Sequence, residues 1–154
     1  MKTNPIKLAK ILCFVQIALL VLFVAVYALS AQDIIDKNQT PDNAGQQLGT
    51  GLALALFLVF SLIVCGYDAV VQLVFGILFS KIGKPKGQKI CLILYVVLHA
   101  IFVPAFLYIA VCLLATFNLP LLFVASMIAV CAVGIANLVV ASIAISKLPK
   151  PATL

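Results

Sequence analysis

The sequence of 154 residues contains no arginine and no glutamate, and it has only four aspartates and one histidine. The lack of glutamate excludes the HExxH motif of zinc metalloproteases. The lack of arginine excludes the anionic-thiolate site that four-helix glutathione-type membrane transferases use. One histidine and one aspartate within the apolar runs are too few for a zinc site or a magnesium-binding aspartate cluster. We therefore expect no metal and no cofactor.

Reactive cysteine and serine arrangements are also missing. The five cysteines all lie in apolar runs, and no CxxC pair occurs, which argues against a disulfide framework or a thiol oxidase. No serine has the sequence context of a nucleophile elbow, and no P-loop occurs. We predict no catalytic residue, and the sequence favours a protein that is not an enzyme.

Long apolar runs are what the sequence does contain. Hydrophobic residues make up 66% of the chain and charged residues 9%, and the mean hydropathy is +1.30. A water-soluble domain of this size could not bury so much apolar surface. The runs cover about residues 11–31, 49–80, 90–117 and 121–146, and each reaches the ~20 residues that cross a bilayer. We predict an all-α membrane protein, a single domain (residues 1–154) of four transmembrane helices.

Lysines mark the ends of these runs and predict the topology. Nine of the ten lysines flank helix ends that four crossings would place on one side; the polar segment 32–48 on the other side holds one lysine and three aspartates. The positive-inside rule makes the lysine-rich side cytoplasmic. The sequence thus predicts an up-down antiparallel bundle with both termini in the cytoplasm, in what we expect is a bacterial cytoplasmic membrane. The nine are Lys2, Lys7, Lys10, Lys81, Lys84, Lys86, Lys89, Lys147 and Lys150. Because they anchor helices, the net charge of +6 does not indicate nucleic-acid binding.

Polar residues within the apolar runs are the candidate functional residues. A carboxylate at membrane depth is costly and normally faces protein or water, so Asp68 is the central one. Ser61, Cys65, Asp68 and Gln72 share one helical face at spacings of four, three and four residues.

Depth along the helices suggests which polar groups meet. Counting the helical rise of ~1.5 Å per residue from the cytoplasmic lysines puts Asp68, Gln72, His99 and Asn137 at a similar level. We expect these four side chains to form an intramembrane polar cluster, with Gln16 nearer the cytoplasmic face. The cluster can serve as interhelical hydrogen bonding or as a proton or ion relay.

Two further sets of residues complete the predicted sites. A cavity beside the cluster would be lined by Ser61, Cys65, Tyr95 and Phe106. Small residues allow close helix approach in lipid. On the last helix they are Ala125, Ala129, Ala132, Gly134 and Ala136, which we expect to pack on a neighbour within the chain or in a partner.

Three hypotheses for function follow. The first is a non-catalytic subunit or accessory protein of a larger membrane complex of the transport type. The second is a small oligomeric transporter or channel coupled to protons or ions through Asp68 and His99. The third is an intramembrane enzyme or lipid-binding protein. The expected partners are the lipid bilayer and either further copies of the chain or a larger membrane complex.

Overall fold

The computed structural model describes residues 5–37, 44–83 and 85–148, and they form four helices. The helices are α1 (Pro5–Lys37), α2 (Ala44–Lys81), α3 (Pro85–Thr116) and α4 (Leu121–Lys147). All four are long and apolar enough to span a membrane, which indicates an integral membrane protein. Helices suit this solvent because they satisfy every interior backbone N–H and C=O within one segment.

The helices extend beyond the apolar runs that predicted them. α1 continues through Gln32–Lys37, where Gln32 donates to Asp36 at 3.0 Å and Lys37 pairs with Asp33 at 3.4 Å. Contacts four residues apart support a helix in water as well as in lipid. Much of the polar segment 32–48 is therefore helical rather than a loop. Hydropathy indicates which residues lie in the lipid, whereas a helix continues for as long as its backbone hydrogen bonds continue.

Proline occupies two different positions in α3. Pro85 begins the helix, where its fixed φ angle and its lack of an N–H cost nothing. Pro104 lies inside the helix, which runs unbroken from Pro85 to Thr116. Pro104 is exposed, so this interruption of the backbone hydrogen bonding faces away from the bundle core.

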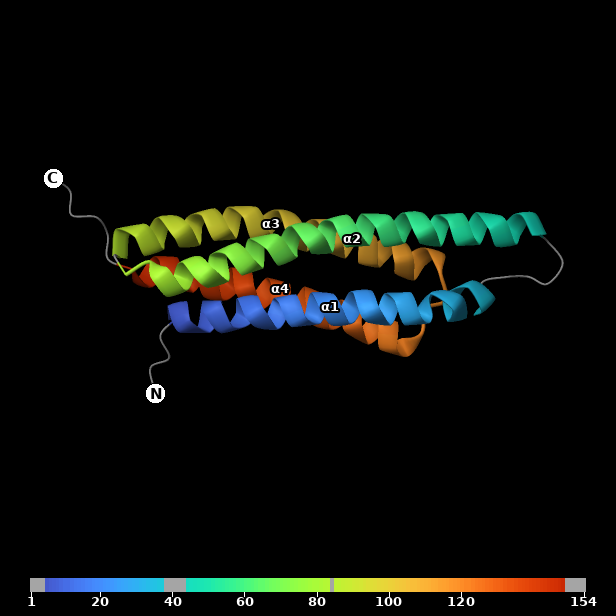
Figure 1. The fold of residues 1–154 in the computed structure, drawn as a ribbon, viewed down its shortest axis with the longest axis horizontal. Helices are drawn as coiled ribbons and strands as arrows, with labels where there is room; N and C mark the ends of the chain where they lie inside the picture. Colours follow the sequence, from blue (N-terminus) through green and yellow to red (C-terminus); the bar gives the residue numbers. More distant parts are fainter. Residues whose placement is uncertain (1–4, 38–43, 84, 149–154) are drawn as a thin grey trace.

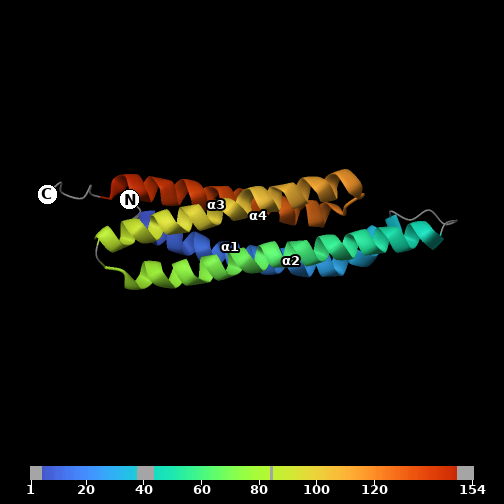
Figure 2. The same cartoon turned by 90° about the horizontal axis from the view of Figure 1, so that it is seen from above.

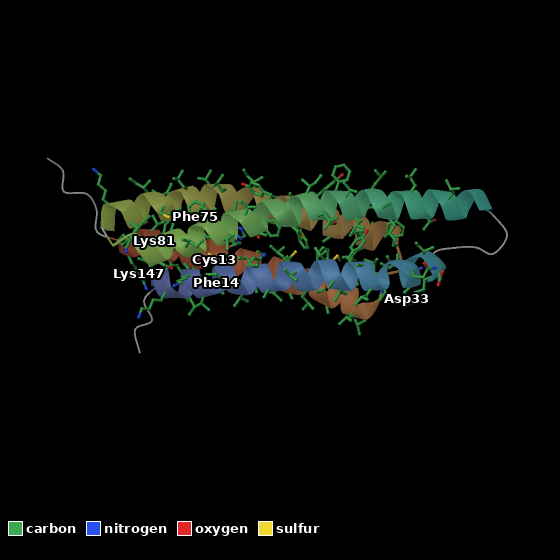
Figure 3. All side chains as sticks on the ribbon, in the orientation of Figure 1. Cys13, Phe14, Asp33, Phe75, Lys81 and Lys147 are labelled. Atoms are coloured by element: carbon green, nitrogen blue, oxygen red, sulfur yellow. The ribbon has the colours of Figure 1, made fainter. Side chains whose placement is uncertain are left out.

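The four helices form a ring in which each packs against two others (Figures 1 and 2). α1 contacts α2 and α4, and α3 contacts the same two helices. Lys81 and Lys147 lie at one end of the bundle and Asp33 lies at the other (Figure 3). Lys2, Lys84 and Lys150 fall outside the described residues.

The interior has two apolar cores. One core holds the aromatic group Phe23, Tyr27, Phe106 and Phe123, whose ring centroids lie 5.1–6.2 Å apart. The other lies toward the lysine end and is built from residues such as Cys13, Phe75, Phe79, Leu92 and Tyr95. On every helix a short interval separates the residues of one core from those of the other. Gln16, His99 and Asn137 lie in this interval, and Asp68 and Gln72 lie at its edges on α2, whereas the buried Ser61 and Ser126 lie along the stretches that form the aromatic core.

Candidate functional site

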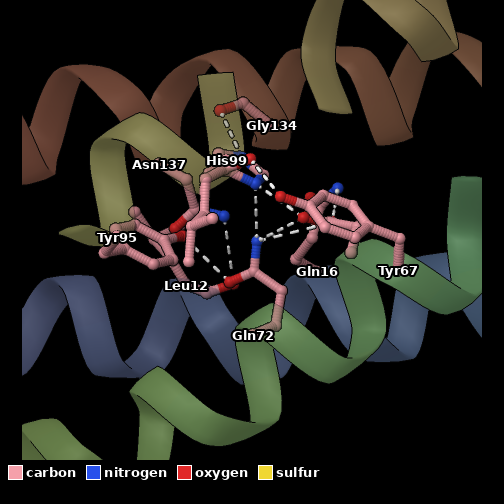
Figure 4. Close-up of polar contacts among 10 residues, drawn as sticks. Leu12, Gln16, Tyr67, Gln72, Tyr95, His99, Gly134 and Asn137 are labelled. Atoms are coloured by element: carbon pink, nitrogen blue, oxygen red, sulfur yellow. Dashed lines mark hydrogen bonds and ion pairs between the residues drawn. The ribbon is translucent and has the colours of Figure 1, made fainter. Parts of the chain in front are cut away.

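Asp68 on α2 lies at the centre of the polar layer and is completely buried. Its Oδ1 lies 2.6 Å from Nδ1 of His99 on α3. Gln72, one turn along α2, donates from Nε2 to Oδ1 at 3.3 Å, and Gln16 on α1 donates to Oδ2 at 3.4 Å (Figure 4). Side chains from three helices thus converge on one carboxylate.

His99 joins this carboxylate to α4. Its Nε2 lies 3.1 Å from the carbonyl oxygen of Gly134, which accepts hydrogen bonds only, so Nε2 carries a proton. Nδ1 and Asp68 Oδ1 then share one further proton, as N–H···O⁻ or as N···H–O. The pair is neutral in both forms. The rings of Tyr95 and Phe102 stack on the imidazole, each with its centroid 5.5 Å away, and fix its orientation.

A second branch of the layer runs from Gln72 toward the lysine end. The Tyr95 hydroxyl donates to Gln72 Oε1 at 2.9 Å, which orients the amide so that Nε2 faces Asp68. A side-chain hydrogen bond also links Tyr95 with Cys13 on α1. Tyr95 therefore connects three helices at the junction between the polar layer and the lysine-end core.

The interface between α1 and α4 contributes Gln16 and Asn137, both completely buried. Asn137 Nδ2 lies 3.5 Å from the carbonyl oxygen of Leu12, at the outer limit of a hydrogen bond. Gln16 Oε1 and Asn137 Oδ1 have no hydrogen-bond partner. Two acceptor oxygens in this interface are therefore unpaired.

The structure brings three of the four predicted cluster residues into direct contact. Asp68, Gln72 and His99 form hydrogen bonds with one another. Asn137 lies one turn beyond Gly134 but contacts Leu12 instead. Gln16 was placed nearer the cytoplasmic face by its distance from Lys10, yet it contacts Asp68. The depth estimate counts the helical rise from the nearest lysine. It includes neither the tilt of the helix nor the length of the glutamine side chain.

The residues expected around a cavity are packed inside the bundle. Cys65 and Phe106 belong to the aromatic core, and Tyr95 belongs to the lysine-end core. Ser61 is buried, and its Oγ has no partner. Cys65 also borders an open apolar groove between α1 and α2, beside Gly66.

The small residues of α4 divide between its two faces. Gly134 is buried against α3, and a Cβ added there would lie 3.4 Å from Val103 Cγ2. Ala129 and Ala136 are half-buried, whereas Ala125 and Ala132 are exposed. The buried face of α4 combines larger and small side chains in equal number: Phe123, Met127, Val130 and Asn137 with Ser126, Gly134, Ala141 and Ala144.

Two participants in the layer were missed by sequence reasoning. Gln16 is the only amide side chain in the first apolar run, and that isolation is a usable signal. The Gly134 carbonyl has no comparable signal, because every residue has a carbonyl. His99 reaches it because Gly134 is buried where α4 packs against α3.

The arrangement limits what chemistry the layer can perform. A proton wire needs groups that both accept and release protons, and neutral amides do so poorly. The amides of Gln16 and Gln72 contact the Asp68–His99 pair, and all four side chains are completely buried. Amide neighbours of this kind favour a role in hydrogen bonding between helices over a role as a proton wire.

Comparison of the chain with protein-family models, with curated proteins and with solved structures finds no match.

Proposed function

We propose that the chain is a non-catalytic subunit or accessory protein of a larger membrane complex of the transport type. It would lie in a bacterial cytoplasmic membrane as an up-down bundle, with both termini and the lysine-rich end in the cytoplasm. The gathering of Lys81 and Lys147 at one end and Asp33 at the other supports this orientation.

The polar layer serves as an interhelical clamp in this proposal. Gln16, Asp68, His99 and Gly134 bring one group from each helix into a connected set of hydrogen bonds. Lipid tails are as apolar as leucine, so helices in a bilayer need such bonds and close packing to hold a specific arrangement. A stable bundle of this kind presents a fixed outer surface to a partner.

The outer face of α4 is the proposed partner surface, and its exposed small residues are the observation that carries the proposal. Ala125 and Ala132 are exposed, seven residues apart, with half-buried Ala129 between them. Seven residues are close to two helical turns, so the three lie along one face. Small side chains on such a face let a second helix approach closely in lipid. Internal packing leaves Ala125 and Ala132 exposed and covers Ala129 only in part.

Mass measurement in lipid nanodiscs formed directly from the native membrane tests this function. We expect the wild-type chain, of 16.4 kDa, to be found in a larger assembly. Replacing Ala125 and Ala132 together by phenylalanine should release it as a single chain. Val70→Phe on α2 is the matched control, because Val70 is 62% exposed and lies on another helix. A wild-type protein with the mass of one chain contradicts the proposal.

A second candidate, a small oligomeric transporter coupled to protons or ions, is favoured by one observation. The 2.6 Å contact between Asp68 and His99 is a short bond between two groups that exchange protons, and it lies deep in an apolar bundle. Intramembrane ionisable pairs of this kind often serve proton or ion movement. The third candidate, an intramembrane enzyme or lipid-binding protein, has no comparable support in the described residues.

A further inference from the structure

The end of the bundle that holds Lys81 and Lys147 receives lysines from every helix. These two residues end α2 and α4, and α1 and α3 begin at the same end, each with two lysines in its first two turns (Figures 1 and 3). Because the helices themselves form a ring, the six positive charges surround this end of the bundle. We call these side chains the lysine ring: Lys7, Lys10, Lys81, Lys86, Lys89 and Lys147.

No acidic side chain in the described part of the chain balances the lysine ring. Asp33 lies at the opposite end of the bundle, with Asp36 three residues further along α1, and Asp68 is buried in the polar layer. Neither α1 nor α3 has an acidic residue in its first turn, and within the described ranges none of the six lysines forms an ion pair. Like charges gathered at one end repel one another, so the ring favours negative charge from outside the chain.

Exposed apolar residues border the lysine ring and place it relative to the lipid. Ile11 and Ile90 directly follow lysines of the ring, and they are 57% and 53% exposed. Ile77 and Ile143 are exposed one turn before the last lysines of α2 and α4. Side chains of this kind face the acyl chains of a bilayer. A lysine stem lies along apolar surface and carries its charge toward the polar boundary, so the ammonium groups lie at the level of the headgroups.

We propose that the lysine ring binds anionic phospholipids through their headgroup phosphates. Clusters of about 4–8 basic residues beside a transmembrane helix attract anionic lipid. The level of the ring favours a lipid over an acidic protein, which would approach from the water beyond the headgroups. Lysine is a flexible point charge, which suits many mobile headgroups better than one ligand of fixed shape.

The inference goes beyond the proposed function, because it assigns a lipid class to a surface that neither the clamp nor the outer face of α4 includes. It also holds for either orientation of the bundle, since it depends on the level of the ring and not on which leaflet contains it.

An electrostatic origin makes the lipid preference sensitive to salt. Exposed charges act over ~10 Å at an ionic strength of ~0.1 M but over only ~3 Å at ~1 M. Binding that depended on the shape of an apolar groove would not weaken in this way. The salt dependence therefore distinguishes the lysine ring from the apolar surface of the helices.

Lipid selection by the purified wild-type protein tests the inference. The protein is captured from mixed micelles that contain equal amounts of phosphatidylglycerol and phosphatidylcholine with the same acyl chains, and both lipids are quantified by mass spectrometry. We expect a preference of about fivefold or more for the anionic lipid at ~0.1 M NaCl, falling close to equal uptake at ~1 M. Inorganic phosphate should displace no more lipid than NaCl of equal ionic strength.

Replacing three ring lysines together by glutamine, Lys81→Gln, Lys86→Gln and Lys89→Gln, should reduce the preference at least by about half. All three side chains are at least partly exposed, and thermal unfolding checks that the variant folds. Lys37→Gln is the matched control and should select lipid as wild type does, because Lys37 pairs with Asp33 at the other end of the bundle.

Equal uptake of the two lipids by folded wild-type protein at low salt overturns the inference, and the ring then serves only to orient the helices. A preference that survives high salt overturns it as well, because the lysine charges would not be its source. Stronger displacement by phosphate than by NaCl would show that the ring takes free anions rather than lipid. The wild-type measurements decide the matter even if the triple variant fails to fold.

Discussion

At the residue scale, Asp68 is tolerated in an apolar bundle because its charge is compensated and its oxygens are bonded. His99 makes the pair neutral, and amides from two helices bond to the carboxylate. Breaking a buried pair by removing one partner is costly, because the other partner is left uncompensated. A large loss of stability on removing Asp68 would indicate a structural clamp. A small loss would indicate a group whose role is in transport.

Asp68→Leu should destabilise the bundle more than Asp68→Asn. Leucine leaves the Gln16 amide without its partner and His99 Nδ1 with only the Gln72 amide, and we expect a loss of about 3 kcal/mol in the free energy of unfolding. Asparagine can donate to Nδ1 and accept one amide, and we expect a loss of about 1 kcal/mol. Equilibrium unfolding in mixed micelles measures both.

Asp36→Asn is the control for this pair of variants, because Asp36 is exposed and bonds only within α1. An Asp68→Leu protein as stable as wild type would contradict the clamp. If Asp68→Asn stays stable in liposomes but abolishes proton-driven flux seen with wild type, the transporter becomes the better account.

At the element scale, α4 packs against α3 at the buried residue Gly134. A Cβ there would meet Val103 at 3.4 Å and Phe102 at 3.6 Å, which are ordinary packing distances. At Gly66 on α2, by contrast, a Cβ meets nothing within 4 Å. The two glycines therefore separate the effect of helix packing from that of helix propensity.

Gly134→Ala should leave stability unchanged or raise it slightly, because the Cβ fits and alanine favours helix by about 1 kcal/mol over glycine. Gly134→Leu should lower stability by about 1–3 kcal/mol, because the larger side chain forces α3 and α4 apart and breaks the His99 contact. Thermal unfolding compares both with Gly66→Leu, which should be at least as stable as wild type, because a Cβ there meets nothing within 4 Å and leucine favours helix over glycine. A stable Gly134→Leu protein would show that this contact does not hold the helices together.

At the scale of the whole molecule, charge is segregated along the bundle axis. Lysines flank the end that holds Lys81 and Lys147, while Asp33 and Asp36 lie on the last turns of α1 at the other end. This asymmetry is the basis for placing the lysine end in the cytoplasm.

Cysteine labelling in sealed cells tests that orientation. In a background without the native cysteines, Asp36→Cys should react with an impermeant maleimide from outside. Lys86→Cys and Lys147→Cys should react only after the membrane is opened, because they would lie on the cytoplasmic side. Labelling of Lys86→Cys and Lys147→Cys from opposite faces would contradict the proposed topology.

The sequence by itself determined the solvent and the number of helices. Four apolar runs that each exceed bilayer length leave few alternatives, since backbone polar groups in lipid must be paired within a helix. It also indicated Asp68, Gln72 and His99, because polar side chains stand out against an apolar background. The ends of the helices were less well predicted, because hydropathy does not report where backbone hydrogen bonding ends.

Only the tertiary structure decided which groups meet. Gln16 reaches Asp68, the Gly134 backbone accepts from His99, and Asn137 turns to Leu12. It also decided that Ala125 and Ala132 face outward. Helical periodicity gives the face that a residue shares with its neighbours along the chain. The rotation of each helix about its own axis and its tilt come from the packing of all four helices together.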